Sequence, residues 1–374
     1  MPVSPLPPRA GISANRLRAP GGRQTHARSG DPVPATVGEW LRTEFPNASD
    51  ADIAGLLRQS DEPVVGPPNT RSNGLSDRPR DSRSDAQADE TEVRAGQMCD
   101  AAGRPVTAAD PVVPGGFYWF HRPVPPEERI PFEVGIVHAD ADLLVVDKPH
   151  FLASTPNGRF VRECVVTRLR VEREEPDLVA IHRLDRVTAG LLVLSRRPET
   201  RGAYQRLFQD RRVRKTYRAL AEVPAGFDGW EAPRPGEECV RRIERWSRLE
   251  KEPGTRQMLE VPGEPNAHST IEYLGAAGRL GDFRLTPHTG RTHQLRVHMN
   301  GLGLPILGDP VYPVDLAPDP YDFSSPLQLV AEKLAFTDPL TGEPREFTSR
   351  LTLSGALGCT GRRCCGLTLR GSSD

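Results

Sequence analysis

Cysteine and long apolar runs are scarce in this chain of 374 residues. The few cysteines are Cys99, Cys164, Cys239, Cys359, Cys364 and Cys365. Their scatter along so long a chain does not fit a disulfide framework. No stretch approaches the roughly 18 consecutive apolar residues of a membrane-spanning helix, and the Pro- and Arg-rich start lacks the apolar core of a secretion signal. We therefore expect a cytoplasmic protein with no membrane partner.

An excess of charge of one sign is also missing. Lys and Arg total 49 against 50 Asp and Glu, a formal net charge of −1. This balance gives no global electrostatic signature for nucleic acid, so a site for a polyanion must be a local patch. The chain contains neither a P-loop nor a G-x-G-x-x-G motif, and no nucleotide cofactor has a cradle. Chemistry must then come from side chains.

Composition divides the chain into blocks. Residues 1–34 and 61–92 are rich in Pro, Ser, Asp and Arg and poor in large apolar residues, which predicts disorder. Residues 353–374 are expected to form a flexible tail with free thiols. The tail sequence "CTGRRCC" could hold a metal ion, but a second Cys/His pair at ligand spacing is absent.

Residues 35–122, around the expected disordered insertion 61–92, predict a small module of helices and strands. Apolar residues at helical spacing indicate two short helices in "TVGEWLRTEFPNASDADIAGLLRQ", and Ser49 or Asp50 can cap the second. Turn signals at 100–103 and 114–116 then separate short apolar runs typical of β-strands.

Residues 131–352 read as a larger mixed domain. Alternating apolar strands such as "GIVHADADLLVVDKPHFL" are followed by a helical pattern in "PETRGAYQRLFQD" and a strand in "RVRKTYRALAEV". Pro149 implies that a strand ends at Lys148. Because the regular alternation of a doubly wound parallel sheet is missing, we expect an α+β domain with a large, mainly antiparallel sheet.

The stretch "IHRLDRVTAGLLVLSRR" places Asp185 in a polar break before an apolar run. A carboxylate fixed in this way can act as a nucleophile or general base if a cation keeps it ionised and water is excluded. The alternative is a turn aspartate that hydrogen-bonds its own backbone.

A second group of polar residues lies in "LTPHTGRTHQLRVHMNGLGLPILGDPVY". The spacing predicts a helix over 292–300 that carries Arg296 and ends near two glycines. His288, His293 and His298 are five residues apart, which does not match the i, i+4 spacing of a helical zinc pair. We expect no metal site and interpret these histidines as hydrogen-bonding or phosphate-contacting groups.

Together, "HRLDRVTAGLLVLS", "RKTYRAL" and "TGRTHQLRVHMNGLGLPILGDPVY" resemble the RluA-type pseudouridine synthases, which isomerise uridine in ribosomal or transfer RNA. The resemblance spans about residues 131–350 and implies the pseudouridine synthase fold, with no cofactor. Residues 35–122 resemble the αL RNA-binding motif shared with a small-subunit ribosomal protein. The implied partner is structured RNA, either rRNA or tRNA, and we expect a monomer.

The resemblance also assigns residues. It implies that Asp185 is the catalytic aspartate, that Tyr217 lies against the target base, and that Arg296 pairs with the aspartate. Arg183 resembles the arginine that fills the gap left by the flipped nucleotide. Ala189 stands where many relatives have serine, a common variation.

Basic residues between Arg196 and Arg218 predict a phosphate-binding face on a helix and the following strand. The residues expected to contact RNA are Arg183, His182, Arg291, His293, Arg211, Arg212 and Lys215.

Alternatives remain open from the sequence. The same fold could serve a catalytically silent RNA-binding or ribosome-assembly factor. A nucleoside or glycoside hydrolase could instead combine Asp185 with Asp309 or Asp282, although the sequence singles out no second acid. Attack on the sugar and attack on the ring are also not distinguished.

Overall fold

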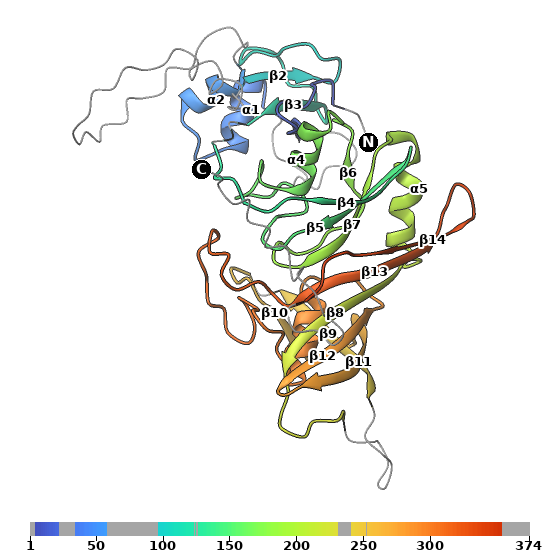
Figure 1. Ribbon diagram of the computed structural model, residues 1–374. Coiled ribbons are helices and arrows are strands. Elements are labelled where there is room, and N and C mark those ends of the chain that lie inside the picture. Colours follow the sequence, from blue (N-terminus) through green and yellow to red (C-terminus); the bar gives the residue numbers. More distant parts are fainter. Residues whose placement is uncertain are drawn as a thin grey trace, which may run out of the picture. The chain divides into compact units, whose positions relative to one another are not determined.

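The computed structural model describes residues 4–21, 34–57, 96–122, 124, 126–230, 241–251 and 253–353 (Figure 1). The chain divides into two compact units, Met1–Glu127 and Glu128–Asp374. Among the described residues, none of the helices has the length and apolar character needed to cross a membrane.

The first unit packs two helices with a small antiparallel sheet. Its elements are β1 (Asn15–Arg18), α1 (Val37–Glu44), α2 (Asp50–Leu57), β2 (Gly96–Asp100) and β3 (Phe117–His121), and the strand order is β1-β3-β2. Thr36 begins α1 with a capping box. The Ser49 hydroxyl accepts the Asp52 N–H at 3.2 Å, so Ser49, rather than Asp50, caps α2. Buried Trp40 and Phe120 belong to the core between these elements.

Part of the region expected to be disordered is a strand. β1 pairs with β3 along its whole length, and the adjacent Ile12 and Ala19 are buried. The prediction of disorder was wrong here because composition counts large apolar side chains, whereas an edge strand is held mainly by backbone hydrogen bonds. The expected disordered segment 61–92 and the tail from residue 354 onward lie outside the described residues.

The second unit is built on one 11-stranded mixed sheet. Its elements are β4 (Gly135–Ala139), β5 (Leu143–Lys148), α4 (Val165–Glu172), β6 (Val179–Ala180), β7 (Ala189–Ser195), α5 (Pro198–Gln209), β8 (Arg214–Glu222), β9 (Arg242–Lys251), β10 (Met258–Val261), β11 (Ala267–Ala277), β12 (Leu280–Pro287), α6 (Gln294–Gly301), β13 (Leu329–Thr337) and β14 (Pro344–Thr348). The main strand order is β10-β9-β11-β12-β8-β13-β7-β5-β4, with β14 on β13 and β6 on β7. Every described pairing is antiparallel except β13 with β7, which confirms the expected large, mainly antiparallel sheet.

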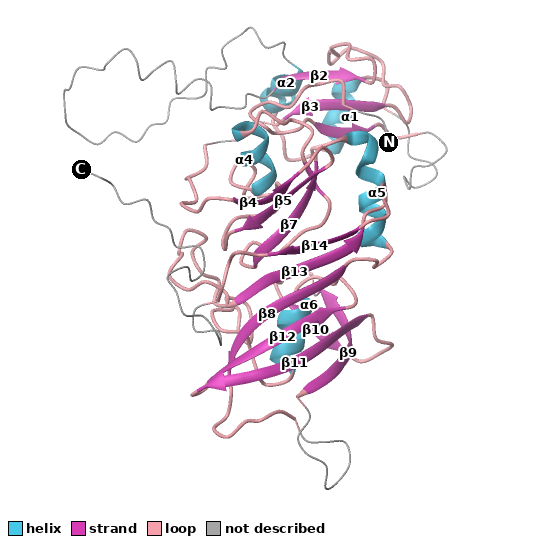
Figure 2. Cartoon of the chain, turned by 45° about the vertical axis from the view of Figure 1, so that its right-hand side comes forward, coloured by secondary structure: helices cyan, strands magenta, loops and turns pink. Residues whose placement is uncertain are grey.

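Burial along the strands explains the apolar runs. Every residue of β5 and β7 is buried, because alternate side chains enter two different cores. Leu192 and Leu194 of β7 join the core that includes α4 residues, whereas Leu191 and Val193 join the one that includes α5 residues. Most of β9 alternates between exposed and half-buried residues because α6 covers only one face of strands β9 to β12 (Figure 2).

Gly190 allows β7 and β13 to approach each other. Its φ is +110°, and a Cβ on it would lie 2.4 Å from the Ala331 carbonyl oxygen. This parallel contact joins the β4–β7 half of the sheet to the β8–β13 half, so the loop before β7 is brought beside α6.

Gly190→Ala should destabilise the protein by about 2 kcal/mol or more, because it adds both backbone strain and a clash with Ala331. Urea unfolding checks this. Gly202→Ala is the matched control, since nothing lies within 4 Å of that position in α5, and Ala should stabilise a helix by up to about 1 kcal/mol. Equal stability of the two variants would contradict this account of the β7–β13 contact.

Candidate active site

Asp185 lies in a tight turn that is fastened to the buried Ser154. The Thr188 N–H donates to the Asp185 carbonyl at 3.1 Å. The Ser154 hydroxyl accepts the Leu184 N–H at 3.0 Å and donates to the Leu184 carbonyl at 2.9 Å. The Asp185 side chain remains 30% exposed and lines a cavity of about 1150 Å³. The turn therefore presents a fixed carboxylate to a space large enough for a nucleoside.

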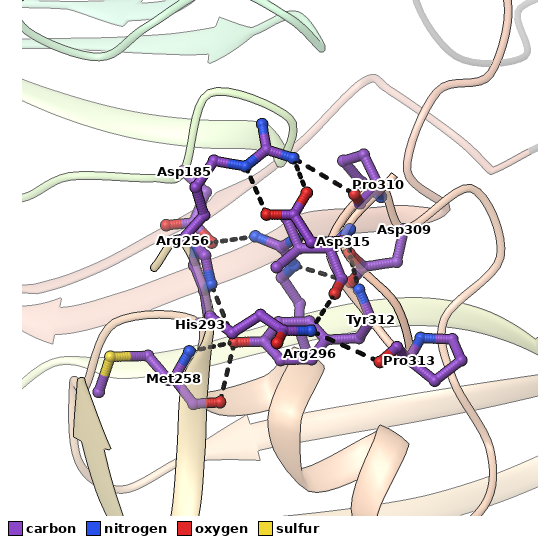
Figure 3. A network of polar contacts seen from close by, with 12 residues as sticks. Asp185, Arg256, Met258, His293, Arg296, Asp309, Pro310, Tyr312, Pro313 and Asp315 are labelled. Carbon is purple, nitrogen blue, oxygen red and sulfur yellow. Dashed lines mark hydrogen bonds and ion pairs between the residues drawn. The ribbon is translucent and has the colours of Figure 1, made fainter. Parts of the chain in front are cut away.

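Arg296 of α6 joins Asp185 to a second carboxylate, Asp309 (Figure 3). Its guanidinium is only 2% exposed. Nε and Nη2 donate to the Asp309 carboxylate at 2.8 and 2.6 Å, and Nη1 donates to Asp185 Oδ2 at 3.2 Å. Burial opposes the charge of Arg296, but the bonds and charges of Asp309 and Asp185 outweigh it and raise its pKa. Asp185 thus faces a permanent cation.

Asp309 is in turn held by its own loop. Its Oδ1 accepts the N–H groups of Val311 at 2.9 Å and of Tyr312 at 3.1 Å. The carboxylate is 1% exposed. A second acid for hydrolysis would have to be available to substrate or water, whereas Asp309 is committed to Arg296. Asp282, the other acid considered, is similarly bound by Arg218 through two 2.6 Å bonds.

His293 lies beside this pair. Its Nε2 is 3.9 Å from Asp185 Oδ2, and its Nδ1 is 3.1 Å from the Tyr312 hydroxyl. Burial lowers the pKa of His293, so the ring is neutral at neutral pH and is not a permanent phosphate-binding charge. Its left-handed backbone, with φ 54°, starts α6 at Gln294. The prediction of a helix from residue 292 was therefore two residues early.

Tyr217 of β8 lines the same cavity as Asp185 and is half-buried. Burial, followed by the charge of Asp185, raises the pKa of its phenol. The ring is therefore neutral. The structure brings Asp185, Tyr217 and Arg296 to one cavity from segments that are far apart in the sequence.

Comparisons with known proteins identify the family of the chain. A family model described as RNA pseudouridylate synthase matches residues 142–301. The dual-specificity RNA pseudouridine synthases RluA of Salmonella typhi and Escherichia coli are each 34% identical over 227 residues, covering 60% of this chain and 94% of theirs. The chain belongs to the RNA pseudouridine synthase family.

Further relatives are more distant from this synthase. An uncharacterised RNA pseudouridine synthase of Synechocystis is 30% identical over 234 residues, covering 61% of this chain and 75% of its own. A solved structure of human RNA pseudouridylate synthase domain containing 1 is 23% identical, with a TM-score of 0.45, and covers 63% of this chain and 94% of its own.

Lys148 is a buried residue near Asp185 that was not predicted from the sequence as a site residue. It has no exposed surface, and its Nζ donates to the carbonyls of Pro149, Leu152 and Arg186 at 2.9, 2.8 and 3.1 Å. Burial lowers its pKa to about 7, although the nearby Asp185 opposes the shift. Lys148 ties the end of β5 to the Asp185 turn. A lysine at the end of a strand that begins with four apolar residues, Leu143 to Val146, was the available signal.

His182 has a different environment from that expected of an RNA contact. Its Nε2 accepts the Val193 N–H at 3.2 Å, and its ring stacks on Phe208 at 4.5 Å. Burial lowers its pKa to about 3, so it carries no charge at neutral pH. It forms part of the cavity wall, whereas its neighbour Arg183 is exposed at the same cavity.

The basic residues gather in a second hollow of about 630 Å³. The basic side chains that line it are Arg211, Arg212, Arg214, Lys215, Arg291 and, when protonated, His288. Lys215 and Arg291 line both hollows. The single basic face expected from Arg196 to Arg218 is not formed. Arg196 instead pairs with Glu175 at 2.8 Å, and Arg218 pairs with Asp282 at 2.6 Å.

Glu244, His268 and His288 are the described residues that gather ligand atoms, all within 4.8 Å of one another. Ring nitrogens bind a metal in the plane of the ring. The two imidazoles are stacked, with centroids 4.2 Å apart and planes at 22°, so their lone pairs run nearly side by side. This arrangement does not direct both nitrogens at one ion.

Asp309→Ala should lower the free energy of unfolding of the synthase by about 3–5 kcal/mol, because it leaves the buried Arg296 guanidinium without its main partner. Asp315→Ala is the matched control, since Asp315 pairs with the half-exposed Arg256 and exposed pairs contribute about 1 kcal/mol or less. Denaturant unfolding measures both. A loss for Asp309→Ala no larger than that for Asp315→Ala would contradict the assigned role.

Proposed function

We propose that this synthase isomerises uridine to pseudouridine within RNA and that Asp185 is its catalytic carboxylate. The observation that carries the proposal is the position of Asp185, which Arg296 holds at the wall of a cavity that Tyr217 also lines. A preorganised cation beside a carboxylate orients it without reorganisation during the reaction.

The reaction requires few groups. The bond between N1 of uracil and C1′ of ribose breaks, the detached base turns, and a bond forms between C5 and the same C1′. The proton on C5 is lost and N1 gains one, so the composition of the nucleotide is unchanged. Since no redox change or group donor is involved, we expect no cofactor. Asp185 can act as a nucleophile on the sugar or on the ring, or as a base on the ribose.

The target base must leave its stack to reach Asp185, at a cost of a few kcal/mol. A base stacked on Tyr217 recovers about 1–3 kcal/mol. Arg183, exposed at the cavity, is proposed to fill the space that the flipped nucleotide leaves in the RNA. Catalytic and flipping functions are thereby assigned to different sides of the same turn.

The RNA backbone is proposed to follow the second hollow. Arg211, Arg212, Lys215 and Arg291 supply positive charge there, directly beside the catalytic cavity, as phosphate binding requires. His293 is proposed to contact the nucleotide as a neutral hydrogen-bonding group. The substrate is a structured ribosomal or transfer RNA, and the enzyme acts as a monomer in the cytoplasm.

The first unit is proposed to be the RNA-binding module. Helices α1 and α2, followed by strands β2 and β3, have the order expected for the αL motif over residues 35–122, and residues 131–352 form the catalytic domain. Arg16 and Arg18 of β1 lie over the Phe117 ring at 5.1 and 5.4 Å. This arrangement places cations and an aromatic ring on one sheet, which suits contact with RNA.

The proposal predicts that pseudouridine formation by this protein requires Asp185. Total RNA is incubated with the protein or with Asp185→Asn, and pseudouridines are then mapped. New pseudouridines should appear at specific positions with the unsubstituted protein and be absent with Asp185→Asn. The surface substitution Glu264→Gln should leave the map unchanged. New pseudouridines formed equally by Asp185→Asn would overturn the role of Asp185, and none formed by either protein would leave a silent RNA-binding factor.

A further inference from the structure

A row of three aromatic rings crosses the exposed face of the large sheet. Trp246 of β9 is opposite His268 of β11. His288, the residue after β12, donates its N–H to the His268 carbonyl at 2.9 Å. Cross-strand neighbours have their Cβ atoms about 4.5–5.5 Å apart, which allows planar side chains to stack. The ring centroids of Trp246 and His268 are 3.5 Å apart with their planes at 9°, and those of His268 and His288 are 4.2 Å apart with their planes at 22°.

This row lies on the face of the sheet opposite α6. Ser247, the next residue along β9, meets His298 of α6 at 3.0 Å, and side chains alternate along a strand. Trp246 therefore projects from the uncovered face and is 58% exposed. Since His268 covers one side of the indole, the other side is available to solvent.

Polar contacts hold the His268 and His288 rings through their ring nitrogens. His268 Nε2 is 2.6 Å from Glu244 Oε2, and the Thr270 hydroxyl is 2.9 Å from Glu244 Oε1 and 2.8 Å from His288 Nε2. These contacts leave the faces of the rings for stacking. Glu244 gives the edge of the row a negative charge, which disfavours a phosphate there but not the uncharged face of a base.

The row is continuous with the basic second hollow. His288 lines that hollow together with Arg214 and Lys215, which lie on opposite faces of β8 because their side chains alternate. The hollow therefore passes around the ends of the strands, from the catalytic side to the side that carries Trp246. A backbone bound in the hollow would deliver its next bases to the ring row.

We propose that Trp246, extended by His268 and His288, is a stacking platform for an unpaired base of the substrate RNA outside the catalytic cavity. This inference rests on the proposed function, since it needs RNA in the second hollow. Every base has a π-face, so the platform selects single-stranded segments rather than a particular sequence. It would make the synthase prefer a uridine flanked by unpaired nucleotides over one within a continuous duplex.

The test uses the full chain and a labelled single-stranded oligouridine of 12 nucleotides, with an RNA duplex of equal length for comparison. Binding is followed by anisotropy, and stacking by quenching of tryptophan fluorescence. Trp246→Ala should weaken oligouridine binding roughly tenfold, while duplex binding stays unchanged. Trp246→Phe, which keeps a ring, should restore most of the affinity but remove the quenching that Trp246 contributes. Leu340→Ala, at another exposed apolar residue, should change neither.

Oligouridine binding that is insensitive to Trp246→Ala, or binding without fluorescence quenching, would overturn the platform. A metal site is the alternative. If Trp246→Ala leaves oligouridine binding intact, and the unsubstituted protein retains one equivalent of zinc that His288→Gln abolishes, the cluster is a metal site and the platform is overturned. Pseudouridine formation that depends on Asp185 is measured separately. If the protein modifies RNA and Trp246→Ala does not change oligouridine binding, the proposed function stands and only the platform is rejected.

Discussion

The site depends on one buried cation placed between two carboxylates. A guanidinium that is 2% exposed cannot stay charged in a protein interior unless its donors are satisfied by acceptors and its charge is balanced. Asp309 satisfies two donors and is itself fixed by backbone N–H groups. The remaining guanidinium nitrogen of Arg296, Nη1, donates to Asp185. The orientation of the proposed catalytic carboxylate is therefore set by a residue more than a hundred positions away in the sequence.

Much of the surrounding architecture brings these charges together. The close contact of β7 and β13 at Gly190 places the Asp185 turn beside α6, which carries Arg296. Lys148 closes the same turn from the other side by binding three carbonyl groups. The buried polar groups are thus connected to one another, which is how polar groups are retained in a core without large unmet costs.

The sequence predicted this arrangement where local pattern and chemistry were sufficient. The large mixed sheet is confirmed by the structure, and Asp185, Tyr217 and Arg296, which were predicted as one site, line one cavity. Asp309 was considered only as a hydrolytic acid, since a pairing across a loop leaves no periodic signal. The burial of His182 could not be predicted, because it depends on Phe208 stacking from another element. For the same reason, the partners of the arginines between residues 196 and 218 could not be predicted, because they lie on other elements.

We expect Asp309 to act on the reaction through Arg296, because it binds Arg296 and does not itself line the cavity. The most direct measurement is the single-turnover rate of Asp309→Asn at saturating concentration of an RNA that the unsubstituted protein modifies, at a temperature where both proteins are folded. We expect a rate at least about tenfold lower with an unchanged RNA dissociation constant, equivalent to about 1.4 kcal/mol of transition-state stabilisation. An unchanged rate in the folded variant would contradict it.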